Sequence, residues 1–165
     1  RGATAQNSGS SSNSNYLPQG VPPTDCVFQC MAQIGALYGE SNFNFATIKA
    51  NYDTIYKAAI ASGSVAPALN GVNEILFSNF VDQYFNRADV TTSQLDSFIQ
   101  GNDNFAIGVF RKYSYDGSKS ELHAVILTGT NGTAYTYTDP QLGGKPGEFE
   151  KNCLLSFVAI TGICP

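Results

Sequence analysis

The sequence predicts an α+β protein in which helices come first and an antiparallel sheet comes last. Between residues 24 and 61, apolar residues recur every three or four positions, which is the spacing of an amphipathic helix. After Gly101 the pattern changes to short segments rich in β-branched and aromatic residues, which is typical of strands. An Asn-Gly pair at 131–132, between two such segments, indicates a tight hairpin. Helices followed by hairpin-connected strands favour an α+β arrangement.

Four helices are predicted in the first hundred residues. Their ranges are 24–39, 46–61, 71–86 and 92–100. The first begins at Thr24 or Asp25, either of which can cap the free amides, and it ends at Gly39. Its apolar face consists of Val27, Cys30, Met31, Ile34 and Leu37. The last has Thr91 or Thr92 as its cap.

The strands are predicted in the second part of the chain. Their ranges are 104–113, 121–130, 133–140 and 154–163. Segments 114–120 and 141–147 are rich in Gly, Ser or Pro, and we expect them to be a turn and a loop. Because consecutive strands are joined by short connections, the sheet should be an antiparallel meander.

Composition limits the classes of function. The chain has 165 residues, of which 42% are hydrophobic and 13% are charged, and this suits one domain with an ordinary core. The nine Lys and Arg residues are scattered and the net charge is −4, which disfavours nucleic-acid binding. No apolar run is long enough for a membrane span. We expect a low-complexity, disordered tail over 1–16 and the domain over 17–165.

The chain begins with Arg and has abundant Ser, Thr, Asn and Gly, as exported proteins often do. We therefore expect a processed protein that is secreted, extracellular or periplasmic. We also expect it to act as a monomer.

The single histidine, His123, precedes an apolar strand, and Asp139 ends the strand after the Asn-Gly hairpin. If these strands pair across the hairpin, paired residue numbers sum to about 263, so that His123 lies opposite Asp139 or Pro140. A carboxylate in this position selects one imidazole tautomer and stabilises an imidazolium. The alternatives are a structural histidine with satisfied hydrogen bonds and an aspartate that starts an Asp-Pro turn.

The four cysteines differ in their predicted environments. Cys26 lies in the first turn of the first helix, exposed at the helix start, where free amides and the helix dipole stabilise a thiolate. Cys30 lies on the packing face and should be an inert core thiol. A Cys26–Cys30 disulfide within one helical turn has poor geometry. Cys153 and Cys164 are able to close a small disulfide loop only in an oxidising compartment, and the sequence leaves this open.

An oxyanion would be stabilised by the backbone N–H of Cys26 and by a side-chain amide upstream, for which Gln19 is the candidate. The alternative for Gln19 is an ordinary exposed loop residue. Zinc would need more ligands at set spacings than one histidine and scattered cysteines provide, so we expect neither a metal nor a cofactor.

The segment "TDCVFQCMAQIGALYG" resembles the nucleophile helix of papain-like cysteine peptidases, in which a cysteine follows Asp and a second cysteine lies inside the helix. It is closest to the stand-alone relatives of the bacterial peptidases that remove double-glycine leader peptides from bacteriocins. "HAV" at 123–125, the Asp139-Pro140 pair and the later Gly143-Gly144 also match that branch. The resemblance covers about residues 17–162 and implies a papain-like fold with helices before a twisted antiparallel sheet.

Two departures concern the oxyanion hole. Val27 stands where the family has glycine, and Gln19 lies seven residues before the cysteine instead of about six. The resemblance implies a cysteine peptidase (a thiol hydrolase) with Cys26 as nucleophile, His123 as base and acid, and Asp139 as the residue that orients His123. Its substrate would be a peptide or protein. The alternatives are an inactive papain-like binding module and a secreted effector or toxin domain that acts on a side-chain or cell-wall amide.

Overall fold

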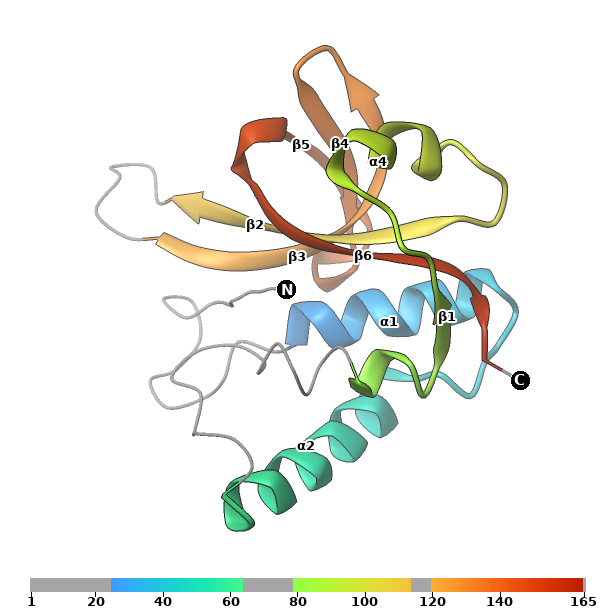
Figure 1. The fold of residues 1–165 in the computed structure, drawn as a ribbon, viewed down its shortest axis with the longest axis vertical. Helices are drawn as coiled ribbons and strands as arrows, with labels where there is room; N and C mark the ends of the chain where they lie inside the picture. Colours follow the sequence, from blue (N-terminus) through green and yellow to red (C-terminus); the bar gives the residue numbers. More distant parts are fainter. Residues whose placement is uncertain (1–24, 64–78, 114–119, 165) are drawn as a thin grey trace.

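The computed structural model describes residues 25–63, 79–113 and 120–164. The predicted tail, Gln19, Thr24 and most of the turn at 114–120 lie outside these ranges, as does the first half of the predicted third helix. The described residues form helices and a six-stranded antiparallel sheet, which confirms the α+β class (Figure 1). No helix among them is long and apolar enough to cross a membrane.

Three predicted helices are present nearly as expected. They are α1 (Asp25–Leu37), α2 (Phe45–Ala61) and α4 (Thr92–Ile99). At the end of α1 the chain turns at Gly39, whose φ of +87° is a conformation that glycine adopts without strain. The Asn44 side chain caps α2 by accepting a hydrogen bond from the Thr47 amide at 2.9 Å. Thr91 is the N-cap residue of α4, as predicted, and its backbone amide donates a 3.0 Å hydrogen bond to the side chain of Gln94 in a capping box.

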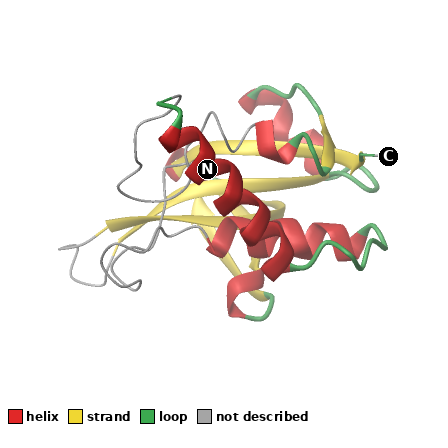
Figure 2. Ribbon diagram, turned by 90° about the horizontal axis from the view of Figure 1, so that it is seen from below, coloured by secondary structure: helices red, strands yellow, loops and turns green. Residues whose placement is uncertain are grey.

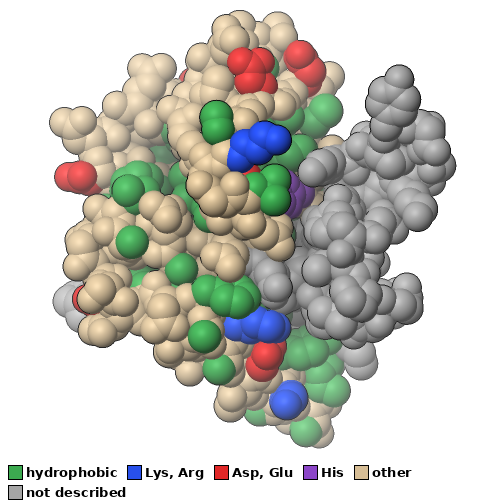
Figure 3. Space-filling view, turned by 180° about the vertical axis from the view of Figure 1, so that it is seen from behind, with side chains coloured by type: hydrophobic (Ala, Val, Ile, Leu, Met, Phe, Trp, Pro, Cys, Tyr) green, Lys and Arg blue, Asp and Glu red, His purple; other side chains and the backbone are tan. Residues whose placement is uncertain are grey.

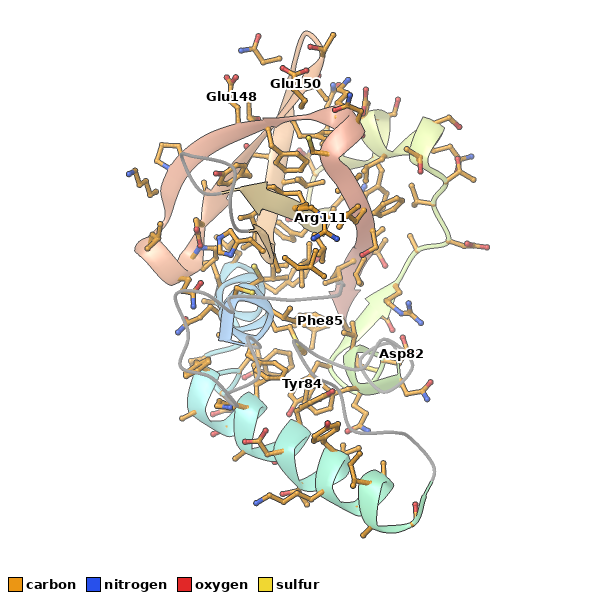
Figure 4. All side chains as sticks on the ribbon, turned by 90° about the vertical axis from the view of Figure 1, so that its left-hand side faces the viewer. Asp82, Tyr84, Phe85, Arg111, Glu148 and Glu150 are labelled. Carbon is orange, nitrogen blue, oxygen red and sulfur yellow. The ribbon has the colours of Figure 1, made fainter. Side chains whose placement is uncertain are left out.

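The predicted third helix is wrong at its C-terminal end. The chain turns over residues 82–84 and then forms strand β1 (Phe85–Arg87), which pairs with the last strand. Figure 4 shows Tyr84 and Phe85 beside the helices, where both rings contact Phe43 at centroid distances of 5.1 and 5.5 Å. These long-range contacts override the local helical spacing, which cannot reveal them.

The sheet has the strand order β1-β6-β2-β3-β4-β5, with every neighbouring pair antiparallel. The remaining strands are β2 (Phe105–Tyr113), β3 (Ser120–Asn131), β4 (Ala134–Asp139), β5 (Lys145–Glu150) and β6 (Leu154–Ile163). Strands β2, β3 and β4 follow one another as predicted, and β5 extends this meander. Strand β6, predicted as the last strand of the meander, instead returns to pair with the other side of β2. The loop predicted at 141–147 is wrong in part, because β5 begins at Lys145.

The composition of β5 is not that of a typical strand, which is why the sequence pattern did not predict it. It contains Pro146 and Gly147 and alternating charged residues, and only Phe149 is buried. Such a sequence is typical of an edge strand, where one side of the backbone needs no partner. Glu148 and Glu150 lie at the end of the sheet away from α1 and α2 (Figure 4), and they accept hydrogen bonds from Asn131 and Thr133.

Two hydrophobic clusters lie on opposite faces of the sheet. The first joins α1 and α2 to one face through residues such as Met31, Ile34 and Ile107. The second joins α4 to the other face, with Leu95 and Phe110 among its members. Figures 1 and 2 show the resulting order of layers, in which α1 lies between the sheet and α2 while α4 covers the far side. The first cluster therefore holds the start of α1 against β3, which carries His123 and is paired with β4, the strand that carries Asp139.

The two C-terminal cysteines lie at opposite ends of β6. Cys153 precedes this ten-residue strand and Cys164 follows it. An extended strand of that length spans about 33 Å, whereas a disulfide needs Cα atoms within about 7 Å. The fold therefore excludes a Cys153–Cys164 loop, and all four cysteines are free of disulfides.

Candidate active site

The candidate nucleophile lies at the beginning of α1. Cys26 is the second residue of the helix, so its amide belongs to the first turn, in which N–H groups have no acceptor inside the helix. The positive end of the helix dipole also stabilises negative charge at this position. The residue is only 3% exposed and packs in the first cluster. The prediction that Cys26 is exposed is therefore wrong, although its place in the first turn is as predicted.

Cys30 lies one turn further along α1 and is completely buried. Burial raises the pKa of its thiol well above the ordinary value, and the nearby Cys26 and Asp139 raise it further. A thiol that is kept neutral in this way is a poor nucleophile. The structure thus separates the two cysteines as the helical spacing predicts, with Cys30 as a packing residue.

His123 and Asp139 form the buried polar pair of the site. The Nε2 atom of His123 lies 2.6 Å from Oδ2 of Asp139. The residues are 4% and 3% exposed, and within the described ranges they are the polar residues that the core encloses. In Figure 3, where the histidine is purple, only a small part of it reaches the surface. Such a short, dry hydrogen bond fixes which imidazole nitrogen carries the proton that faces the carboxylate.

The pairing of β3 with β4 differs slightly from the predicted register. Beside the turn, Asn131 pairs with Ala134, and beyond an irregularity near Gly129, Ile126 pairs with Thr138. Asp139 directly follows Thr138, the partner of Ile126, so it is not opposite His123. The two side chains meet diagonally, because diagonal neighbours on one face of a sheet are within reach of each other. The proximity of the two side chains agrees with the prediction, but direct opposition does not.

Both oxygens of the Asp139 carboxylate have partners. While Oδ2 bonds to His123, Oδ1 accepts a 3.0 Å hydrogen bond from the backbone amide of Gln141. This bond caps the short 3₁₀ helix η2 (Pro140–Leu142), which ends at Gly143 with φ +72°. The Asp-Pro turn and the partnership with histidine, which were alternatives at the level of the sequence, are thus both present. The turn fixes the position of the carboxylate through Oδ1, while Oδ2 forms the hydrogen bond with the imidazole.

The other ring nitrogen of His123, Nδ1, has different surroundings. Nδ1 is buried and makes no hydrogen bond of good geometry with the part of the chain that the structure describes. The Cys26 side chain nevertheless lies close enough to interact with the imidazole. Cys26 and His123 are therefore interacting neighbours, and the alignment of such a pair often becomes tighter when a substrate binds.

The surroundings of His123 favour the imidazolium. Burial by itself lowers the pKa of His123, because it removes water from the charged form. The hydrogen bond to Asp139, the hydrogen bond to Cys26 and the electrostatic interactions with these two residues act in the opposite direction and prevail. Together they raise the pKa from 6.5 to about 9. At neutral pH the site therefore places a positive charge beside the Cys26 sulfur.

A pocket of about 740 Å³ lies beside the site. Thr138 and Pro140, which flank Asp139 in the sequence, line it together with Gln33 from α1 and Gly143. Cys26, His123 and Asp139 do not line this pocket. It is therefore not the place where a reacting bond would meet the thiol.

Two further points concern the predicted residues. Gln19 lies outside the described residues, so its part in an oxyanion hole stays a prediction. Within the described ranges, no three His, Cys, Asp or Glu side chains gather in a way that could hold a metal ion.

Two groups of the site escaped the sequence patterns. They are the Gln141 amide, which holds Asp139, and the Phe110 ring, which contacts His123. The Asp-Pro pair is a signal for the first, because Asp commonly accepts a hydrogen bond from the amide two residues later. For Phe110 no local signal exists, since the contact depends on how β2 pairs with β3.

The chain matches no family model, and no curated protein or solved structure is detectably similar to it. A function therefore has to be inferred from the arrangement of its own residues.

Proposed function

We propose that this protein is a thiol hydrolase of the papain-like type, which cleaves peptide or amide bonds with Cys26, His123 and Asp139. The observation that carries the proposal is the buried 2.6 Å bond from His123 Nε2 to Asp139, together with the interaction of the same imidazole with Cys26. A thiol at a helix start, an imidazole beside it and a carboxylate that orients the imidazole are the three parts of this chemistry. The order of helices before an antiparallel sheet agrees with a papain-like fold.

In the proposed reaction the resting pair is a Cys26 thiolate and a His123 imidazolium. The thiolate attacks the carbonyl carbon, and a tetrahedral oxyanion forms. The backbone N–H of Cys26 and the Gln19 side chain stabilise that oxyanion. The C–N bond then breaks, and the leaving amine takes the proton from Nδ1 of His123.

Hydrolysis of the thioester completes the cycle. Neutral His123 accepts a proton from water through Nδ1, and the resulting hydroxide attacks the thioester carbon. The C–S bond then breaks, the acid product leaves, and the Cys26 thiolate and the His123 imidazolium are restored. Asp139 keeps the Nε2–H in place throughout, so the same nitrogen, Nδ1, handles every proton. This sequence of steps needs no metal or cofactor, and its substrate would be a peptide or protein met outside the cytoplasm.

A peptide library with mass-spectrometric detection of new termini tests the proposal across many candidate substrate sequences at once. We expect cleavage by the native chain and none by Cys26→Ala. Cys30→Ala is the matched control, since it removes a cysteine from the same helix but should leave cleavage in place if it folds. Cleavage that persists in Cys26→Ala would overturn the assignment.

The alternative is a non-catalytic binding module with the same architecture. Val27 favours it, because this residue is 3% exposed and packs in the core at the position where the resembling peptidases have glycine. In that case the library stays intact, and a partner captured by the native chain is captured equally by Cys26→Ala. A domain that acts on a side-chain or cell-wall amide would instead be recognised by cleavage of such substrates that disappears in Cys26→Ala.

A further inference from the structure

The aromatic residue Phe110 packs against the imidazole of His123. The two residues are paired directly across β2 and β3, and their ring centroids lie 5.9 Å apart at an interplanar angle of 74°. Edge-to-face contacts of this kind are attractive beyond the area that they bury. Phe110 is 6% exposed, so it forms a nearly dry surface next to a nearly dry histidine.

Phe110 is itself held firmly. It stacks on Phe149 of β5 with centroids 4.2 Å apart and an interplanar angle of 9°, and Tyr137 of β4 packs against both rings. Between Val109 and Phe110 the pairing of β2 with β6 shifts register. Such irregularities change the direction of a side chain and are frequent beside active sites.

His123 lies between the two hydrophobic clusters, and this position explains why the Phe110 ring affects the orientation of the imidazole. Cys26 belongs to the first cluster and Phe110 to the second, and the imidazole contacts both. Asp139 holds one end of the imidazole through Nε2, but a single hydrogen bond leaves the ring free to swing about it. A rigid neighbour on the side away from Cys26 removes that freedom. It also keeps water from competing for the Nε2–Oδ2 bond, which is stronger in dry surroundings.

We propose that Phe110 is a positioning residue for His123: its ring restricts the imidazole to the orientation in which Nδ1 serves Cys26, and it shields the bond to Asp139 from water. This assignment rests on the proposed function for its catalytic meaning, but its physical content concerns the imidazole alone. Phe149 supports the arrangement by fixing the Phe110 ring.

The chain's single histidine makes the test direct, since its ring protons can be followed by NMR without overlap from other histidines. In the described part of the chain, Cys26 on α1 and Asp139 on β4 interact with the imidazole, while Cys30 on α1 and Tyr137 on β4 interact with Asp139. Replacement of Phe110 removes none of these titratable groups. A change in the His123 titration therefore reports on the loss of the Phe110 ring.

We expect Phe110→Leu to lower the pKa of His123 from about 9 towards 6.5. Water that enters reduces the burial effect, which by itself would raise the pKa, but the weakened bond to Asp139 and the lost orientation of the imidazole outweigh this. The fall should be about 0.5 to 1 unit, the contribution typical of an aromatic pair. The rate at which iodoacetamide alkylates Cys26 at pH 6 should fall about threefold to tenfold in parallel. Phe110→Tyr keeps the ring and should keep the native titration.

Phe85→Leu is the matched control. It removes a ring that is 1% exposed from the other cluster, so it tests whether loss of a core aromatic alone moves the titration. If Phe110→Leu does not fold, Phe110→Met, which keeps more of the volume, takes its place. A titration of Phe110→Leu or Phe110→Met that equals that of Phe85→Leu would overturn the assignment. Failure of the proposed function would appear as an uncleaved library and would leave the histidine titration readable.

Discussion

The stability of the protein should fall as the pH rises from 6 to above 9, because His123 loses its proton over that range. The pKa of His123 is raised in the folded protein, from 6.5 to about 9. The folded state therefore holds this proton more tightly than the unfolded chain does. The resulting stabilisation is fully present below pH 6.5 and is lost as the pH rises through 9.

The size of this effect follows from the shift. Each pKa unit corresponds to about 1.4 kcal/mol, so the shift of His123 contributes about 3 kcal/mol to the free energy of unfolding at low pH. This is a large fraction of the roughly 5 to 15 kcal/mol that stabilise a typical domain. Asp139→Asn removes the negative charge that faces Nε2, and most of the shift should disappear with it.

Urea denaturation at pH 6 and pH 9.5 measures the effect. Between these values the native chain should lose about 3 kcal/mol more than Asp139→Asn, since the ionisable groups that do not face Asp139 titrate in both proteins and cancel in the comparison. Asp82→Asn is the matched control, because this exposed carboxylate on the surface pairs with Arg87 and lies beside β1 (Figure 4). It should follow the native chain. An equal loss in the native chain and in Asp139→Asn would refute the reasoning.

Three other predictions concern packing and the remaining cysteines. Gly35→Ala should lower the free energy of unfolding by about 1 to 3 kcal/mol in urea, because the added Cβ would lie 2.5 Å from Phe43 Cβ; an unchanged midpoint would contradict this contact. Cys30→Ser should lower it by about 1 to 3 kcal/mol, since a buried hydroxyl replaces a thiol at a fully buried position, whereas Cys164→Ser, at a partly exposed site, should have little effect. Without reductant, iodoacetamide should modify both Cys153 and Cys164; a disulfide-linked peptide would contradict the course of β6.

The parts of the fold that were predictable depend on local patterns. The first helix, its end at Gly39 and the hairpin at 131–132 follow from periodicity and turn chemistry, both of which act over a few residues. Strand β5 and the end of the third predicted helix did not follow. The first is an edge strand without an apolar pattern, and the second is replaced by β1, which exists only because β6 pairs with it.

The candidate site, like the fold, was predictable only where local patterns determine it. The neighbourhood of His123 and Asp139 was predictable, because a tight hairpin leaves little choice in which residues meet. The exact register was not, since the irregularity near Gly129 moves the partners along the strand. The burial of Cys26 was also not predictable, because it depends on how α1 lies against the sheet. The contact of Phe110 with His123 has the same origin.

The central claim is that Cys26 is an activated thiol served by His123, and the pH dependence of its alkylation tests this most directly. With iodoacetamide and mass-spectrometric detection, Cys26 should react at pH 5.5 to 6 at a rate above those of Cys30, Cys153 and Cys164. This advantage should disappear in His123→Ala. If Cys26 instead reacts no faster than Cys153 and Cys164, with a rate that rises only towards the pH at which ordinary thiols ionise, the claim is contradicted.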